Sequence, residues 1–155
     1  MRRKRNIQRD IAPDLKFGSV ALATFINYVM ERGKKSLAER IVYKTLDLIS
    51  AKEKIDPMQV FEKAIEHVSP TVEVRSRRVG GASYQVPREV KGRRKTALTY
   101  RWILGVVRAK KGRPIHERLA EELIAASKNE GDAIKKKQDT HRMAEANRAF
   151  AHFGW

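Results

Sequence analysis

Apolar positions recur at helical spacing in the first part of the chain. Three helices are therefore expected, over residues 20–30, 36–54 and 57–68. Gly33 ends the first apolar run, and Ser36 is the predicted N-cap of the second helix, whose inward face would begin with Leu37. The third helix has the clearest start signal, because Asp56 at an N-cap precedes Pro57 at the first helical position.

The apolar positions change to alternation over residues 71–90, where TVEVRSRRV and ASYQVPREV flank Gly80–Gly81. Val72 and Val74 alternate with charged residues, and two glycines permit positive φ at both positions of a tight turn. Pro87 has no N–H to donate to a strand ladder, so the return strand is expected at an edge. A lone two-stranded hairpin is marginal in water. We therefore expect its outer half to project and to be steadied by a partner.

Helical spacing returns after the hairpin, and three further helices are expected over residues 93–108, 114–128 and 132–150. Leu98 and Trp102 should face inward on the first of them, and Asp132 should cap the last. The predicted fold class is mainly α: a bundle of about six helices with one projecting β-hairpin between helices three and four. All of it is expected to form one domain over residues 1–155.

Positive charge is concentrated in two stretches of the chain. Residues 1–10 carry five Lys or Arg side chains against Asp10, and residues 75–113 carry thirteen against Glu89, so these stretches hold +4 and +12 of the formal net charge of +16. Nucleic acid, an anionic membrane surface or an acidic protein could each attract such a chain. A charged arm and one charged internal stretch on a neutral body favour binding to a nucleic-acid backbone.

The N-terminal residues 1–12 are expected to be a flexible basic arm, because they have too few apolar side chains to offset the entropy of ordering. Such an arm should become ordered when it meets a partner. No apolar run approaches the roughly 20 residues of a membrane span, no signal peptide is visible, and the chain contains no cysteine. These features predict a protein of the reducing cytoplasm with no membrane partner.

Candidate RNA-binding side chains lie on the hairpin and at the start of the following helix. They are Arg75, Arg77, Arg78 and Tyr84 on the hairpin, and Lys91, Arg93, Arg94 and Lys95 at the helix start. Guanidinium groups bind phosphates, and a tyrosine ring can stack on an unpaired base. Cations at a helix N-terminus are unfavourable unless an anion binds there too. The alternative interpretation is a solvated hairpin edge and a solvated charge run.

Further cations give weaker signals, since Lys runs at helix ends are often only solvated. They are Arg101, Arg108, Lys110, Lys111, Arg113 and the run Lys135–Lys137. Arg101 and Arg108 fall at near-helical intervals with Arg94, away from the predicted inward face. The helix after the hairpin is therefore expected to carry both core and charge.

Nothing in the sequence favours catalysis. The four histidines, His67, His116, His141 and His152, have neither metal-ligand spacing nor a carboxylate cluster beside them, and no glycine-rich loop leads to Lys-Ser or Lys-Thr. We therefore predict a protein that is not an enzyme and has no metal or cofactor. Two alternatives share its charge: a basic DNA-architectural protein, and a metal-dependent nuclease, which would need clustered acids.

Several segments resemble bacterial ribosomal protein seven of the small subunit. They are RRVGGASYQVP in the hairpin, DTHRMAEANRAFAHF near the end and DPMQVFEKAIEHVSP before the hairpin, with KFGS, FINYVM and GKKSLAERIVYKTLD in the region of the first two helices. The resemblance runs from about Ile11 to Trp155. It departs from the family pattern at Leu15, where proline is common, and at Thr24, where a basic residue is common.

The resemblance implies six helices, a β-hairpin and binding to the 3′ major domain of small-subunit rRNA. It also implies early assembly of the subunit head, neighbouring ribosomal proteins as partners, and a position near the exit-site tRNA and the mRNA path. Carried over by position, the rRNA contacts would include Arg2, Arg3, Lys4, Arg5, Arg9, Lys34, Lys35 and Arg93 to Lys95. The hairpin from Arg75 to Tyr84 would reach toward rRNA, tRNA and mRNA, with Lys136 and Arg142 nearby.

Overall fold

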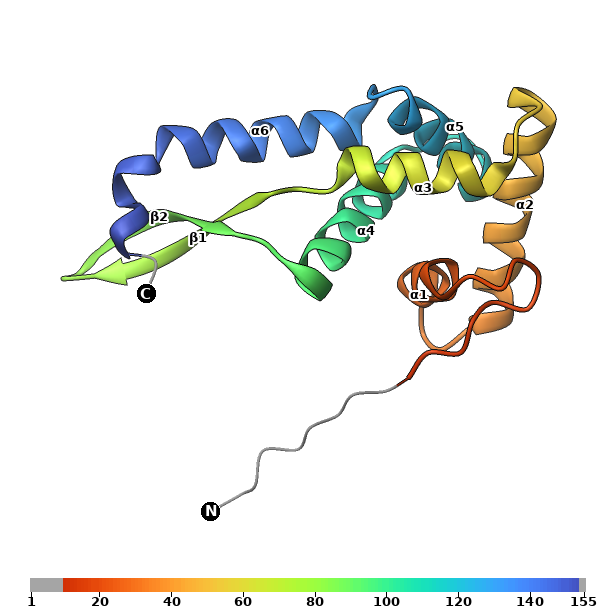
Figure 1. The fold of residues 1–155 in the computed structure, drawn as a ribbon, viewed down its shortest axis with the longest axis horizontal. Helices are drawn as coiled ribbons and strands as arrows, with labels where there is room; N and C mark the ends of the chain where they lie inside the picture. Colours follow the sequence, from red (N-terminus) through yellow and green to blue (C-terminus); the bar gives the residue numbers. More distant parts are fainter. Residues whose placement is uncertain (1–9, 154–155) are drawn as a thin grey trace, which may run out of the picture. The chain divides into compact units, whose positions relative to one another are not determined.

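The computed structural model describes residues 10–153 of the chain. Its elements are α1 (Val20–Val29), α2 (Lys35–Glu53), α3 (Pro57–Val68), β1 (Val72–Val79), β2 (Ala82–Glu89), α4 (Gly92–Ala109), α5 (Ile115–Ser127), α6 (Asp132–Ala146) and the 3-10 helix η1 (Arg148–Phe153) (Figure 1). The predicted fold class, mainly α with one hairpin between helices three and four, is confirmed. Every helix in this described part is too short or too polar to span a bilayer.

The chain divides into two compact units, one ending at Arg40 and the other beginning at Ile41. In the first unit, the carboxylate of Asp14 accepts hydrogen bonds from the backbone N–H groups of Lys16 and Phe17, both at 3.0 Å. The hydroxyl of Ser19 caps α1 by accepting a bond from the Leu22 N–H at 3.3 Å. The prediction of one domain over the whole chain stays a prediction.

The helix α2 begins at Lys35, earlier than the predicted N-cap at Ser36 implies. The backbone carbonyl of Lys34 already accepts a hydrogen bond from the Ala38 N–H at 3.3 Å, so Ser36 lies in the first turn and is not the N-cap. Leu37, which was expected to face inward, is 47% exposed, and Ala38 is buried instead. Each residue rotates a helix by about 100°, so a predicted buried face that is out of phase by one residue exposes Leu37, while tertiary packing buries Ala38.

The core of the second unit is formed by α3, α4 and α5, which pack against one another. Tyr100 of α4 is 1% exposed, and Phe61 of α3 and Leu123 of α5 are also buried. The expectation for Leu98 is confirmed, whereas Trp102 is half-buried and lies at the edge of this core. Tyr100 and Trp102 are both aromatic side chains that carry one polar group. Their positions around the α4 helix place Tyr100 in the interior.

A buried carboxylate joins α4, α5 and α6. Glu122 of α5 is 1% exposed, and its Oε2 accepts a hydrogen bond from the Lys110 Nζ at 2.6 Å while its Oε1 accepts one from the Ala133 N–H at 2.8 Å. The Lys110 Nζ also lies 3.1 Å from the Asp132 Oδ2. Burial alone would lower the pKa of Lys110, but the two carboxylates raise it above its ordinary value. We call this group the Glu122 junction.

The start of α6 requires a glycine at the Glu122 junction. The N-cap is Gly131, with a φ of 95°, so the prediction that Asp132 caps this helix is wrong. A Cβ atom at Gly131 would lie 2.9 Å from the Glu122 Oε1 and 3.2 Å from the Ala125 Cβ. Because both oxygens of Glu122 are already hydrogen-bonded, this carboxylate cannot move away at low cost.

The hairpin packs against α6 and η1. Its strands are antiparallel, with Arg77 opposite Tyr84 and Val74 opposite Pro87. Figure 1 shows α6 running alongside the hairpin and η1 beside its outer half, and both elements contact it. As predicted, β1 and β2 form a two-stranded sheet of their own in the described part of the chain, and α6 and η1 pack against it, which local pattern could not reveal.

We predict that Gly131→Ala destabilises the fold more than Gly112→Ala. Both glycines have positive φ, near 95°, but a Cβ at Gly112 would meet nothing within 4 Å. The positive φ should cost about 1–3 kcal/mol in each variant, and crowding at Glu122 should add roughly 1–3 kcal/mol in Gly131→Ala. Urea unfolding followed by circular dichroism measures both, and equal losses would contradict the crowding.

Candidate nucleic-acid interface

Three arginines repeat along one face of α4. Arg94, Arg101 and Arg108 are each seven residues apart, nearly two helical turns or about 10 Å along the axis, and all are exposed. Ala97 and Gly105 fall close to the same face between them. These small residues leave room for a ligand to approach the helix between the guanidinium groups.

A buried carboxylate links this face to the hairpin. Glu73 of β1 is 6% exposed and accepts hydrogen bonds from the Arg75 Nε at 2.6 Å and from the Arg94 Nε and Nη2 at 3.1 and 2.8 Å. The side chains of Arg75 and Arg94 remain 50% and 43% exposed. Arg75, Arg94, Arg101 and Arg108 thus form a continuous set across the hairpin and α4, which we call the arginine row.

The state of Glu73 follows from its surroundings. Burial alone would raise the pKa of this carboxyl, but the hydrogen bonds from Arg94 and Arg75, together with their positive charges, lower it below its ordinary value. Glu73 is therefore ionised at neutral pH. Its charge offsets the repulsion between two guanidinium groups that it holds close together.

Sequence reasoning missed Glu73 and its cross-strand neighbour Arg88. The alternation predicts Val72 and Val74 as the inward residues of β1, yet both are half-buried and Glu73 between them is buried. Residues i and i+2 of a strand share a face, so the spacing of Glu73 and Arg75 was the available signal. Arg88 lies opposite Glu73 and is exposed, which adds a cation beside the arginine row.

The hairpin candidates do not all face one way. Arg77 and Tyr84 are a cross-strand pair and pack on η1: the Arg77 Nη1 donates to the Phe153 carbonyl oxygen at 2.7 Å, and the Tyr84 ring lies 5.1 Å from that of Phe150. Arg78 is exposed and, as the next residue along β1, points to the opposite face. The structure therefore gives Arg77 and Tyr84 partners within the chain, in addition to any role in binding RNA.

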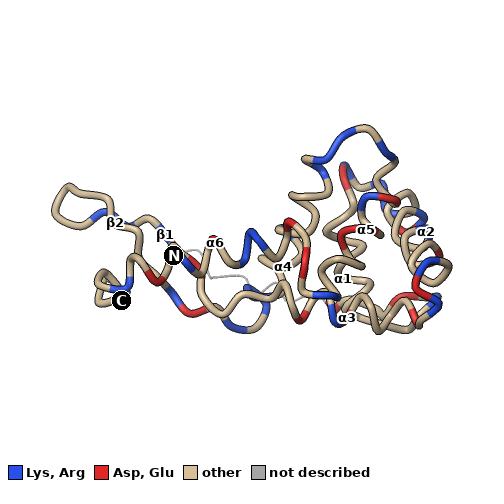
Figure 2. The backbone as a smooth tube through the Cα atoms, turned by 90° about the horizontal axis from the view of Figure 1, so that it is seen from above, with Lys and Arg blue, Asp and Glu red and all other residues tan. Residues whose placement is uncertain are grey.

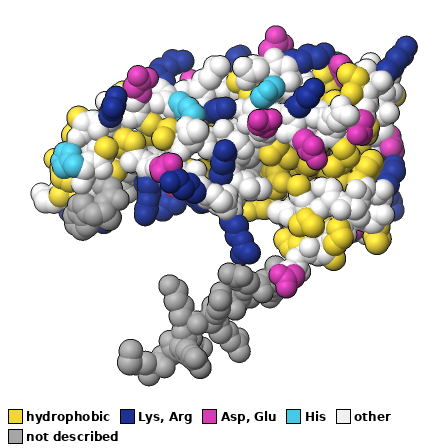
Figure 3. All heavy atoms as spheres, in the orientation of Figure 1, with side chains coloured by type: hydrophobic (Ala, Val, Ile, Leu, Met, Phe, Trp, Pro, Cys, Tyr) yellow, Lys and Arg dark blue, Asp and Glu magenta, His cyan; other side chains and the backbone are white. Residues whose placement is uncertain are grey.

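Cations also gather where α4 begins. Lys91 and Arg93 are exposed, and the Lys91 Nζ lies 2.9 Å from the Glu89 Oε2. Lys95 faces α6, where burial and the nearby Lys95 charge together lower the pKa of Lys137. The dark-blue side chains in Figure 3 collect along the lower edge, beneath the hairpin and the start of α4, and Figure 2 shows Lys and Arg along the hairpin and α6.

The weaker candidates have mixed surroundings. Lys110 belongs to the Glu122 junction, the Arg113 Nη1 lies 2.6 Å from the Glu121 Oε1, and the Arg142 Nη2 lies 3.7 Å from the Asp139 Oδ1. Lys111 and Lys136 are exposed. Lys110 is the candidate whose charge is offset most completely within the chain, since two carboxylates contact it.

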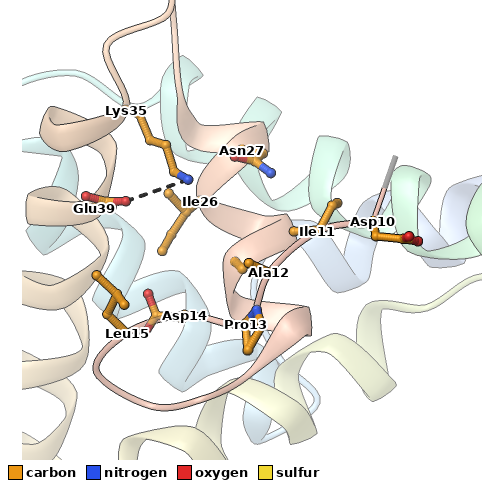
Figure 4. A pocket seen from close by; sticks show the side chains of 11 residues that line it. Asp10, Ile11, Ala12, Pro13, Asp14, Leu15, Ile26, Asn27, Lys35 and Glu39 are labelled. Atoms are coloured by element: carbon orange, nitrogen blue, oxygen red, sulfur yellow. Dashed lines mark ion pairs between the residues drawn. The ribbon is translucent and has the colours of Figure 1, made fainter. Parts of the chain in front are cut away.

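In the first unit, Lys34 and Lys35 are exposed, and the Lys35 Nζ lies 4.0 Å from the Glu39 Oε1. Lys35 and Glu39 border a pocket of about 460 Å³, which is lined by residues 10–15, by α1 and by the first turns of α2 (Figure 4). Across residues 10–153 no group of His, Cys, Asp and Glu could hold a metal ion. Outside the described residues lie Trp155 and the candidates of the N-terminal arm, which are Arg2, Arg3, Lys4, Arg5 and Arg9.

We predict that Glu73→Gln lowers the free energy of unfolding by about 1–3 kcal/mol at pH 7, because the three charge-assisted hydrogen bonds from Arg75 and Arg94 weaken. The folded-state pKa of Glu73 is lowered, so its contribution is complete above its ordinary value of 4.5 and is lost as the pH falls through the lowered pKa. The difference between wild type and variant should therefore shrink in acid. Urea titrations across pH measure it.

Glu89→Gln is the matched control, because it removes the same charge from the other strand at a side chain that is 67% exposed. Its effect should stay below about 1 kcal/mol. A Glu73→Gln loss no larger than that of Glu89→Gln would contradict the importance of the buried carboxylate.

Comparisons with known proteins address the identity of the chain. Residues 1–148 match the family model described as ribosomal protein S7p/S5e. The small ribosomal subunit protein uS7 of Thermotoga maritima is 60% identical over 155 residues, covering the whole of both chains. The uS7 proteins of Chloroflexus aurantiacus and Maricaulis maris are 57% and 55% identical, each covering 99% of both chains.

These matches agree with the resemblance predicted from the hairpin and helix motifs, and also with the predicted ribosomal location. The family consists of structural ribosomal proteins, so the prediction that the chain is not an enzyme is confirmed by its relatives. The chain therefore belongs to the ribosomal protein S7p/S5e family and is a structural, rRNA-binding component of the small ribosomal subunit.

Proposed function

We propose that the chain is a primary rRNA-binding protein that nucleates folding of the 3′ major domain, the head of the small subunit. The observation that carries this proposal is the arginine row, which continues from the hairpin onto α4. Guanidinium groups bind phosphate oxygens through paired N–H donors. A row held in place by Glu73 fits the backbone of a folded RNA better than a mobile charged tail would.

The spacing within the row supports contact with an RNA backbone. Ala97 and Gly105 lie between the arginines of α4, and a Cβ added at Gly105 would meet nothing within 4 Å. A sugar-phosphate strand can thus approach the helix closely while the guanidinium groups hold successive phosphates. Recognition of folded RNA depends on such shape and backbone contacts more than on base readout.

The proposed contact set combines cations of the second unit with positions carried over from the family resemblance. From the second unit it comprises the exposed Arg75, Arg78, Arg88, Lys91, Arg93, Arg94, Arg101, Arg108, Lys111, Lys136 and Arg142, together with the half-buried Lys95. From the resemblance it comprises Lys34, Lys35 and the arm residues Arg2, Arg3, Lys4, Arg5 and Arg9. Arg77 and Tyr84 pack on η1, Lys110 lies in the Glu122 junction and Arg113 pairs with Glu121, so we propose that these four candidates contribute to folding as well as to RNA binding.

We further propose that the hairpin turn reaches toward the exit-site tRNA and the mRNA path, and that other surfaces contact neighbouring ribosomal proteins. The support is the position of the exposed Gly80–Gly81 turn at the end of the hairpin, distant from the α3–α5 core (Figure 1). A slender projecting hairpin can reach tRNA or mRNA while the arginine row binds rRNA.

We predict that Arg101→Gln weakens binding to a 3′ major-domain rRNA fragment about tenfold at moderate salt, equivalent to about 1.4 kcal/mol. One lost phosphate contact should also reduce the slope of log K against log salt by about 0.7–0.9. Filter binding over a salt series measures both quantities. Lys63→Gln on the exposed face of α3 is the control, because it removes one charge outside the arginine row.

Equal losses of affinity in the two variants would mean that binding depends on net charge alone, which would contradict the proposed interface. Selectivity is tested with the wild-type chain in the same assay. We expect the rRNA fragment to bind more tightly than duplex DNA or an unrelated folded RNA, and equal affinity for all three would overturn the assignment to a primary rRNA binder.

We also predict that a photoreactive side chain at Ser83, beside the hairpin turn, cross-links to tRNA or mRNA in assembled small subunits. The labelling should depend on the presence of exit-site tRNA and message. The same group at exposed Gln59 of α3 serves as the control. Cross-linking of Ser83 to rRNA alone would contradict the proposed reach of the hairpin.

A further inference from the structure

We propose that η1 is a clamp that fixes the direction of the hairpin, so that Phe150 and Phe153 are positioning residues for RNA binding. The inference rests on the proposed function of the hairpin and α4 as an RNA-binding surface. It assigns an internal structural role to Tyr84, which the sequence presents as a candidate for stacking on a base.

Three aromatic rings form the clamp. The ring centroid of Tyr84 lies 5.1 Å from that of Phe150 and 5.2 Å from that of Phe153, and the two phenylalanine rings are 6.4 Å apart. Offset and tilted aromatic pairs at these separations attract one another beyond their burial. A tyrosine ring held by two neighbours has little surface left for a base.

A hydrogen bond fastens the same point of the hairpin. The Arg77 Nη1 donates to the backbone carbonyl oxygen of Phe153 at 2.7 Å. Arg77 is directly opposite Tyr84 in the strand register, so both contacts fall on one cross-strand pair. The clamp therefore holds both strands of the outer half, since one contact comes from β1 and the other from β2.

The base of the hairpin is fastened to α6 as well. The Thr71 N–H donates to the His141 Nε2 at 3.3 Å, and the Lys137 Nζ donates to the His67 carbonyl oxygen at the end of α3. Burial and the charge of Lys137 lower the pKa of His141, which favours the neutral ring that this bond requires. The segment from α6 to η1 thus holds the hairpin at two places.

The two attachment points are well separated. The six residue steps from Thr71, just before β1, to Arg77 span about 20 Å at roughly 3.3 Å per residue. A two-stranded ribbon of that length bends and twists readily, and alone it is marginally stable. Fixing its outer half before binding removes an ordering cost that RNA would otherwise have to offset.

The test combines two measurements on the full-length double variant Phe150→Ala/Phe153→Ala. Hydrogen exchange of the hairpin amides should accelerate while exchange in α3, α4 and α5 stays unchanged. Affinity for the 3′ major-domain fragment should fall several-fold with an unchanged salt slope, because no phosphate contact is removed. Phe150→Leu/Phe153→Leu should restore part of both properties.

Met143→Ala is the matched control, because it removes an exposed apolar side chain from α6 outside the clamp. It should leave hairpin exchange and affinity unchanged. Unchanged hairpin protection in the double variant would overturn the clamp whatever the RNA result. A reduced salt slope, or tighter binding through a released Tyr84 ring, would overturn it as well by showing direct contact with RNA.

Arg101→Gln, measured in parallel, separates this inference from the proposed function. Weaker binding by Arg101→Gln with normal binding by the phenylalanine variant rejects the positioning role and keeps the interface. Normal binding by Arg101→Gln rejects the interface, whereas faster hairpin exchange in the phenylalanine variant would still support the clamp as a structural device.

Discussion

The surface proposed to bind RNA depends on one buried carboxylate. Arginines close enough to hold neighbouring phosphates repel one another, and that repulsion would spread a row of them apart in the free protein. Glu73 offsets it by accepting hydrogen bonds from Arg75 and Arg94 at 2.6–3.1 Å, and it remains 6% exposed. The inner edges of the two guanidinium groups bind the carboxylate, and half of each side chain stays accessible to a ligand. A negative charge thus organises a positive surface.

A buried carboxylate also organises its neighbours at the other end of α4. Glu122 is buried, and Lys110 and the N–H of Ala133 occupy its two oxygens, which fixes where α6 begins. The position of α6 in turn decides where η1 meets the hairpin. Two buried acids therefore set the geometry of a chain with a net charge of +16. Removing one partner of such a buried pair is far more damaging than losing an exposed ion pair.

Most of the fold could be predicted from the sequence because its signals are local. The Asp56 cap and the Gly80–Gly81 turn each act through neighbours a few residues away, and both predictions hold. The burial of Glu73 and the packing of Tyr84 could not be predicted in this way. Glu73 is buried because Arg94, which is 21 residues further along, closes over it, and alternation alone assigns it to solvent. Tyr84 packs against the rings of Phe150 and Phe153, more than 60 residues further along the chain. An aromatic residue on a basic hairpin suggested base stacking, but only the three-dimensional structure shows these internal partners.

The contact between Arg77 and Phe153 also has a consequence for the order in which the molecule matures. These residues are separated by 76 positions, so at about 5–20 residues per second the ribosome makes Phe153 roughly 4–15 s after Arg77. During that interval the hairpin sequence has been made with its arginines but without the segment proposed to direct it. Under the proposed clamp, a nascent chain that still lacks residues 148–153 should be a poorer ligand for RNA than one that contains them.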